Sequence, residues 1–158
     1  MASTRFRTSI EVTIEVEIER PQSAVWSFLS DVERVSEWLW EIESASKESD
    51  APTAVGTVVH YTLQPGHRSA SIEIVEWDPG RRLAWDGPPL RWGGGAARPR
   101  GSFELADAGE GHTLLVSRYR PELTGTQVLL RPYLQRWLRK RRRADTQTLK
   151  ALIEAGAS

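Results

Sequence analysis

Arg141 and Asp145 are the two residues whose types and spacing most directly suggest chemistry in this 158-residue sequence. They are four positions apart and interrupt, midway, a stripe of apolar residues at helical spacing. Buried charges without partners cost several kcal/mol, so the pair must neutralise itself, meet a polar ligand or reach water. In a binding site, Arg141 would hold a ligand carbonyl or carboxylate, and Asp145 would orient it or act as a general base. The alternative is a surface ion pair worth about 0.3–0.5 kcal/mol.

Tyr61 is a third candidate for chemistry, because the hairpin described below places it on an apolar face. A buried phenol needs a hydrogen-bond partner, and a ligand oxygen would serve as well as a backbone carbonyl. A phenol can also donate a proton to a developing enolate. From the sequence, a ligand-bonded and a backbone-bonded Tyr61 are equally open.

Seven tryptophans are a high number for a chain of this length. Rigid indoles could stack on a flat or polycyclic ligand, and an indole N–H could bind a carbonyl. Ordinary core packing is the alternative for each of them, but we expect at least two to touch a ligand. The tryptophans on segments that would bound an internal cavity are Trp38, Trp40, Trp85, Trp92 and Trp137.

Other kinds of chemistry find little support. The absence of cysteine excludes disulfides, thiolate nucleophiles and Cys-ligated metals. The three histidines are on different segments and lack a zinc-type spacing. The triple glycine at residues 93–95 is not followed by the Lys-Ser/Thr of a phosphate loop, so it is either a hinge that moves Trp92 or a plain loop. We therefore expect neither a metal nor a cofactor.

The net charge is zero, from 21 basic and 21 acidic residues, which argues against a nucleic-acid partner. The basic run at residues 139–143 could meet anionic lipid or nucleic acid, but most of it falls off the apolar stripe, as on a solvated helix face. No apolar run approaches the roughly 18 residues of a membrane helix, and the first residues lack the apolar core of a secretory signal. We expect a cytoplasmic monomer or homodimer without stable membrane insertion.

The ends of the sequence carry the clearest element signals. Apolar and polar residues alternate from residue 10 to residue 19, which predicts a strand with one buried face. Pro21 suits the first turn of a helix, and Ser30 with Glu33 matches a capping box for a second short helix. Pro132 must start or kink a final helix that runs to residue 154.

The middle of the sequence, from about residue 40 to residue 119, predicts consecutive antiparallel strands. A turn at Pro65-Gly66 sets Tyr61 opposite Ala70. A turn at residues 78–80 places Val75 with the inward side chains, which requires a bulge next to it. Residues 87–101 are expected to form an irregular loop.

For the strand at residues 113–119, two orientations stay open. Either Leu114 and Val116 face inward, or Leu115, Ser117 and Tyr119 do.

These elements predict an α+β fold in which a curved antiparallel sheet of about seven strands wraps around the long C-terminal helix, with two short helices after the first strand. Because the curvature of such a sheet is wider than one helix, a cavity for an apolar ligand should remain between them. The residues expected to bind that ligand are Trp38, Trp40, Tyr61, Ile72, Trp85, Trp92, Phe103, Leu115, Tyr119, Leu134, Trp137 and Leu138.

Several segments also carry a family resemblance. The opening strand with RPQSAVWSFLSDVERVSEWLWEIES resembles the start of the START-like superfamily (SRPBCC), in particular its polyketide cyclase/dehydratase and lipid-transport branch. VGTVVHYTL, IVEWDPGRRLAW, GSFELADAGEGHTLL and the ending LKALIEA look similar too. The resemblance covers nearly the whole chain and implies one helix-grip domain over residues 1–158 with an internal hydrophobic cavity.

The resemblance leaves several functions open, since members include cyclases and aromatases, lipid or quinone carriers and hormone receptors. We expect a hydrophobic, aromatic or polyketide-like small molecule in the cavity. If the protein is an enzyme, Tyr61 or the Arg141/Asp145 pair would assist a cofactor-free cyclisation or dehydration. The alternatives are a carrier of lipid, quinone or another apolar ligand, and a membrane-surface adaptor that uses the basic helix.

Overall fold

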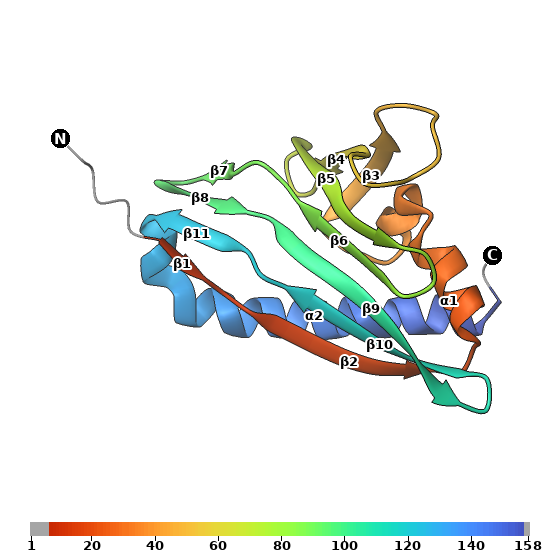
Figure 1. The fold of residues 1–158 in the computed structure, drawn as a ribbon. Helices are drawn as coiled ribbons and strands as arrows, with labels where there is room; N and C mark the ends of the chain where they lie inside the picture. The colour runs from red at the N-terminus through yellow and green to blue at the C-terminus, as the bar shows by residue number, and fades with distance from the viewer. Residues whose placement is uncertain (1–6, 157–158) are drawn as a thin grey trace.

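The computed structural model describes residues 7–156, which form eleven strands, two α-helices and two 3-10 helices. Helix α2 runs along one face of the curved strands (Figure 1). The elements in chain order are β1 (Arg7–Ser9), β2 (Val12–Ile18), α1 (Gln22–Leu29), η1 (Val32–Glu37), β3 (Ile42–Lys47), β4 (Val58–Leu63), β5 (Arg68–Asp78), β6 (Arg82–Asp86), β7 (Leu90–Trp92), β8 (Gly95–Arg98), β9 (Arg100–Gly109), β10 (His112–Tyr119), β11 (Glu122–Gly125), η2 (Thr126–Leu130) and α2 (Arg131–Glu154).

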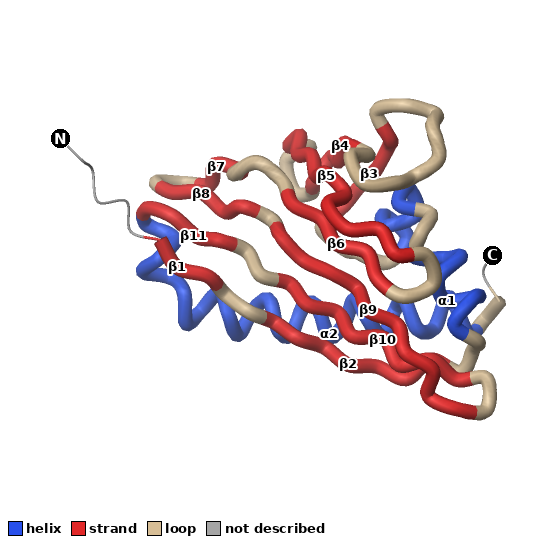
Figure 2. The backbone as a smooth tube through the Cα atoms, viewed as in Figure 1, coloured by secondary structure: helices blue, strands red, loops and turns tan. Residues whose placement is uncertain are grey.

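The strands make two antiparallel sheets. Figure 2 shows their strands in red, and the long helix α2 in blue along one side of them. The larger sheet has seven strands in the order β2-β10-β9-β6-β5-β4-β3, and the smaller has four in the order β1-β11-β8-β7. The predicted α+β architecture, with a curved sheet on a terminal helix, is confirmed. No helix within residues 7–156 is long and apolar enough to cross a bilayer.

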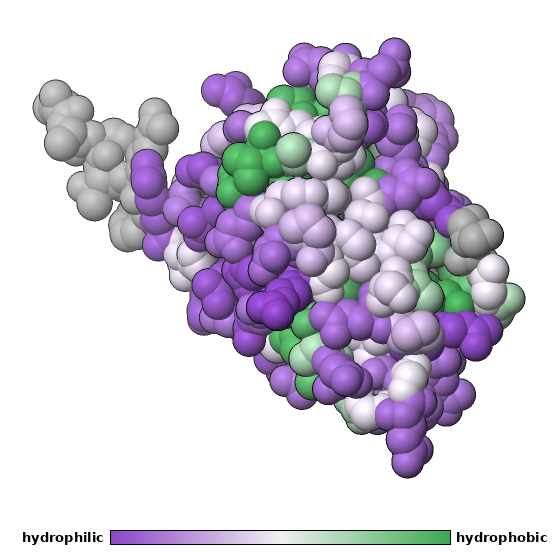
Figure 3. Space-filling model, turned by 45° about the vertical axis from the view of Figure 1, so that its right-hand side comes forward, coloured by the Kyte–Doolittle hydropathy of each residue, from purple (hydrophilic) through white to green (hydrophobic). Residues whose placement is uncertain are grey.

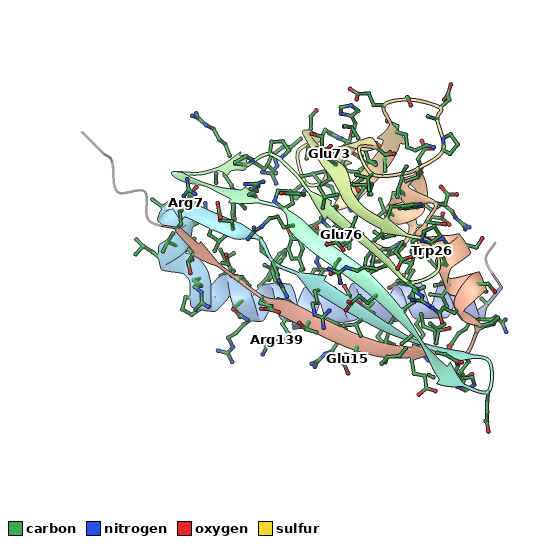
Figure 4. The ribbon with its side chains drawn as sticks, in the orientation of Figure 1. Arg7, Glu15, Trp26, Glu73, Glu76 and Arg139 are labelled. Carbon is green, nitrogen blue, oxygen red and sulfur yellow. The ribbon has the colours of Figure 1, made fainter. Side chains whose placement is uncertain are left out.

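Strand β2 shows why the sheet needs a cover on one side. Its residues alternate between buried and exposed along the whole strand, as the sequence predicts. Glu15, labelled in Figure 4, lies on the exposed face. The buried face packs with Leu149 and Ile153 of α2 and with Phe28 of α1 in the largest apolar cluster. Helix α2 is therefore both a cover for the sheet and a large part of the core.

The central hairpins follow the predicted registers. Tyr61 pairs with Ala70, and Trp77 pairs with Leu83. The ladder shifts between Ile74 and Glu76, so the predicted bulge is present. Val75 is the bulged residue and is exposed, and its predicted place with the inward side chains is therefore wrong.

The expected loop at residues 87–101 is the main error of the sequence prediction. The segment contains β7, β8 and the start of β9. Glycine makes this possible, because a Cβ at Gly95 would lie 2.2 Å from the carbonyl oxygen of Thr124 on the neighbouring strand β11. The glycine-rich sequence therefore permits a close approach of strands here and does not indicate irregular backbone.

Two further points of local structure are settled. On β10, Leu115 and Ser117 are buried, so the second of the two open orientations is the correct one. The second short helix is a 3-10 helix, and its Ser30/Glu33 capping box is not formed. The Ser30 hydroxyl donates instead to the carbonyl of Ser27.

Candidate functional site

The large sheet, the β7–β8 hairpin, η1 and α2 bound a pocket of about 860 Å³. This volume lies within the usual range of small-molecule sites, about 300–1,000 Å³. Leu115, one of the candidate ligand-binding residues, lies in the apolar core and outside this lining. The structure brings the other candidates together on the pocket wall: Trp38, Trp40, Tyr61, Ile72, Trp85, Trp92, Phe103, Tyr119, Leu134, Trp137 and Leu138.

Three aromatic rings form one continuous part of this wall. The Phe103 ring lies 5.7 Å from the Trp38 ring and 4.9 Å from the Trp85 ring, between centroids, and both pairs are tilted. Gly101 makes room for Trp85, because a Cβ there would lie 2.4 Å from the indole. The rings come from the end of η1, from β6 and from β9, so the fold assembles a rigid aromatic surface from three segments.

Three other tryptophans of the pocket are half-exposed. The exposed fractions of Trp40, Trp92 and Trp137 are 45%, 46% and 42%. A side chain that lines a pocket and also meets solvent lies at its rim, so these indoles mark the mouth. Figure 3 shows hydrophobic side chains reaching an otherwise largely hydrophilic surface in separate areas.

Arg142 is the charged group that the sequence analysis missed. It lines the pocket and is only 8% exposed. Its Nη2 donates to Glu41 Oε1 at 2.7 Å, and its guanidinium carbon lies 4.2 Å from the centre of the Tyr119 ring. Burial lowers the pKa of Arg142, but Glu41, Tyr119 and Asp145 outweigh that effect and leave the pKa raised. The guanidinium therefore stays charged.

Arg141 and Asp145 form the expected ion pair, but they lie outside the pocket lining. Asp145 is 1% exposed, and its Oδ1 accepts from Arg141 Nη2 at 2.8 Å and from the backbone N–H of Trp40 at 3.4 Å. Its Oδ2 is 3.9 Å from Arg142 Nη1. Asp145 therefore lies close to Arg142 but outside the pocket lining, and it is not placed to touch a ligand.

Together these contacts link four charges. Arg141 and Arg142 balance Glu41 and Asp145, so the network is neutral as a whole. Neutrality allows it to persist at the edge of an apolar core. It still has unused capacity, because Arg142 Nε and Asp145 Oδ2 are buried and have no hydrogen-bond partner within residues 7–156.

Two tyrosines stand beside this network on the pocket wall. Burial raises the pKa values of both Tyr61 and Tyr119, and Arg142 only partly opposes the effect. Both phenols are therefore protonated and able to donate at any physiological pH. The backbone-bonded alternative for Tyr61 is not what the structure shows, since its hydroxyl has no hydrogen bond to the described residues.

The described residues contain no cluster of three or more His, Asp or Glu side chains that would suit a metal ion. The polar groups on the pocket wall include the guanidinium of Arg142, the hydroxyl of Tyr61 and the carboxylate of Glu41. The sequence carries one weak signal for Arg142: at helical spacing, its position lies between those of Leu138 and Leu149 on the buried side of the helix. It carries no signal for Glu41.

Comparison with solved structures finds the same fold in several proteins. TTHA0849 from Thermus thermophilus is 24% identical, with a TM-score of 0.71 over 94% of this chain and 99% of that one. The Zhui aromatase/cyclase from Streptomyces sp. R1128 is 17% identical, with a TM-score of 0.72 over 93% and 94%. The di-domain ARO/CYC StfQ from the steffimycin biosynthetic pathway is 13% identical, with a TM-score of 0.73 over 94% of this chain and 52% of that one.

At these identities the likeness is one of fold. No curated protein matches the sequence significantly. The sequence profile of one family, described as polyketide cyclase / dehydrase and lipid transport, matches residues 9–154. That match spans nearly the whole chain, and the chain therefore belongs to the polyketide cyclase / dehydrase and lipid transport family.

Proposed function

We propose that this protein binds a flat, apolar molecule that carries ketone oxygens, and that it promotes the cofactor-free cyclisation and dehydration of that molecule. The observation that carries the proposal is the placement of one buried, charged arginine on the wall of an aromatic pocket. The family and the aromatase/cyclases with the same fold support it. Indole and phenyl surfaces hold the carbon skeleton, and Arg142 with Tyr61 recognises its oxygens.

The reaction can be followed through the residues on the wall. Glu41 takes a proton from the carbon between two ketones, and the electron pair of that C–H bond moves into an enolate whose oxygen Arg142 stabilises. The enolate carbon attacks a second ketone carbon in the same chain, and a C–C bond forms. The new alkoxide takes back the proton that Glu41 holds, while Tyr61 donates a hydrogen bond to it. Glu41 then removes the second proton from the carbon between the two ketones, the electron pair of that C–H bond forms a C=C bond, and the hydroxyl leaves with this proton as water. Orientation in the pocket supplies most of the rate.

The neutral charge network favours a neutral polar group on the ligand. A carboxylate beside Arg142 would add a third negative charge to Glu41 and Asp145, in a place where water is scarce. A ketone oxygen accepts from a guanidinium or a phenol without changing the total charge. The ligand class is therefore a ketone or polyketone, in preference to a fatty acid.

Binding is tested with two tricyclic probes of the same shape, anthraquinone and anthracene. Both fit the aromatic wall, but only anthraquinone has carbonyls for Arg142 and Tyr61. Quenching of tryptophan fluorescence should show tighter binding of anthraquinone to the wild type, and Arg142→Met should remove that preference. Arg143→Met, on the exposed face of the same helix, is the matched control. Equal binding of the two probes by the wild type would contradict the proposed role of Arg142.

Catalysis is tested with a linear polyketone thioester, whose cyclised and dehydrated product is identified by mass spectrometry. Tyr61→Phe removes one hydroxyl that bonds to no described residue, so it should slow turnover and leave the folded state intact. Tight binding without any turnover would overturn the catalytic part and leave a carrier of apolar molecules, the alternative function. Failure of both probes and substrate to bind would overturn the proposal as a whole.

A further inference from the structure

The start of helix α2, together with η2 and β7, carries a second feature that the pocket does not explain. Besides Trp40, five large apolar side chains at the mouth end of the molecule are exposed, with Leu129 at 82% and Tyr133 at 67%. Folded proteins seldom expose so many large apolar groups close together without a partner. We define these five residues as the apolar part of a docking face: Trp92, Leu129, Leu130, Tyr133 and Trp137.

The five residues come from two segments that touch. Gln127 Nε2 donates to the carbonyl of Trp92, which joins η2 to the β7–β8 hairpin. Leu129 and Leu130 follow directly in the chain, and Tyr133 and Trp137 lie on successive turns of α2. Figure 1 shows the β7–β8 hairpin and the start of α2 at the same end of the molecule.

A basic stripe runs beside this apolar part. Its four side chains are exposed and have no ion-pair partner in the described part of the chain. The sequence contains no Asp or Glu from residue 123 to residue 144, so no neighbouring acid along the chain offsets these charges. The stripe consists of Arg136, Arg139, Lys140 and Arg143, of which Arg139 is labelled in Figure 4.

We infer that this docking face seats the protein on an anionic lipid surface. Tryptophan, tyrosine and leucine beside a row of arginine and lysine is the pattern of a segment that lies in a membrane interface, with apolar groups among the acyl chains and cations at the headgroups. Helix α2 lies along the surface in this arrangement and does not cross it. Trp92 and Trp137 belong both to the face and to the rim of the pocket, so an apolar ligand would pass between membrane and pocket without entering water.

The inference is independent of any chemistry in the pocket, and its test is too. Sedimentation with vesicles compares phosphatidylcholine alone with phosphatidylcholine that also contains phosphatidylserine. The wild type should bind the anionic vesicles, and added salt should weaken this binding. One basic residue near such a surface contributes about fivefold in affinity, so Arg139→Glu should weaken binding by at least about fivefold.

Matched variants separate the face from net charge alone. Arg81→Glu makes the same change of charge at the exposed turn between β5 and β6, outside the docking face, and should bind as the wild type does. Leu129→Ala combined with Tyr133→Ala should weaken binding to anionic vesicles without changing the charge. Arg142→Met should leave vesicle binding intact even if it abolishes ligand binding, so the two proposals can fail separately.

Two results would overturn the inference. One is no sedimentation of the wild type with anionic vesicles, which would leave an acidic protein as the partner of the basic stripe. The other is an equal loss of binding in Arg139→Glu and Arg81→Glu, which would show a general charge effect with no specific face.

Discussion

Replacing Arg142 by methionine should destabilise the protein by about 2–3 kcal/mol. Breaking a buried ion pair usually costs about 3–5 kcal/mol, because the remaining charge is left without compensation. Two features of this site reduce that figure. The Glu41 side chain keeps 28% of its surface exposed and can be hydrated, and Asp145 retains Arg141 at 2.8 Å. Methionine also replaces part of the contact with the Tyr119 ring.

The double variant Arg142→Met/Glu41→Gln should recover most of this loss. It removes both charges of the pair, and a pair replaced by uncharged groups of similar size is often nearly neutral for stability. We expect its free energy of unfolding within about 1 kcal/mol of the wild type. Urea unfolding followed by tryptophan fluorescence measures all three proteins, with Arg143→Met as the exposed control that should change stability by less than about 0.5 kcal/mol.

Equal stability of Arg142→Met and Arg143→Met would contradict an uncompensated charge on Glu41. A double variant less stable than Arg142→Met alone would contradict it as well, because the loss would then come from packing and not from an unbalanced carboxylate.

Three other predictions concern stability and protonation. Gly101→Ala should lower the free energy of unfolding by about 1–3 kcal/mol and change the near-ultraviolet circular dichroism, because the new methyl group displaces the Trp85 indole. Leu149→Ala, at a fully buried position, should cost about 2–5 kcal/mol in urea unfolding. The hydrogen bond to Glu17 raises the pKa of His112 above 6.5. The pair therefore stabilises the fold fully at a pH below the pKa of His112 in the unfolded chain, and this stabilisation is lost as the pH rises through the pKa of His112 in the folded protein. NMR titration should show a lower pKa of His112 in Glu17→Gln than in the wild type.

Alternation and turn residues in the sequence predict those elements whose structure depends mainly on residues close together in the chain. The alternation in β2 and the register of the β4–β5 hairpin follow from a two-residue period and one turn, and both are confirmed. The β7–β8 hairpin could not be found in this way, because what stabilises it is pairing with β11, more than twenty residues further along the chain. Gly95 looks like a breaker of structure until the nearby Thr124 carbonyl shows why a side chain has no room there.

The candidate site also contains residues that sequence patterns predict and residues that only tertiary contacts identify. The sequence predicts five tryptophans on segments that bound a cavity, and all five line the pocket. The sequence does not distinguish Arg141 from Arg142 as the pocket residue, because they are adjacent and both lie near the apolar stripe. What distinguishes them is Glu41, which is 101 positions away in the sequence and pairs with Arg142. A contact of that kind depends on tertiary structure and leaves no periodic signal.

Arg142 and the basic stripe lie on opposite sides of helix α2, and charge balance explains this arrangement. A helix that carries seven basic residues from Arg131 to Arg143 could not pack on an apolar sheet unless the inward charges were balanced. Glu41 and Asp145 balance those of Arg141 and Arg142, and this leaves one guanidinium at the pocket wall. The outward charges have no such partner within the described residues, so they remain available to an external anion. Balanced charge on the inner side suits a neutral ligand, and unbalanced charge on the outer side suits an anionic surface.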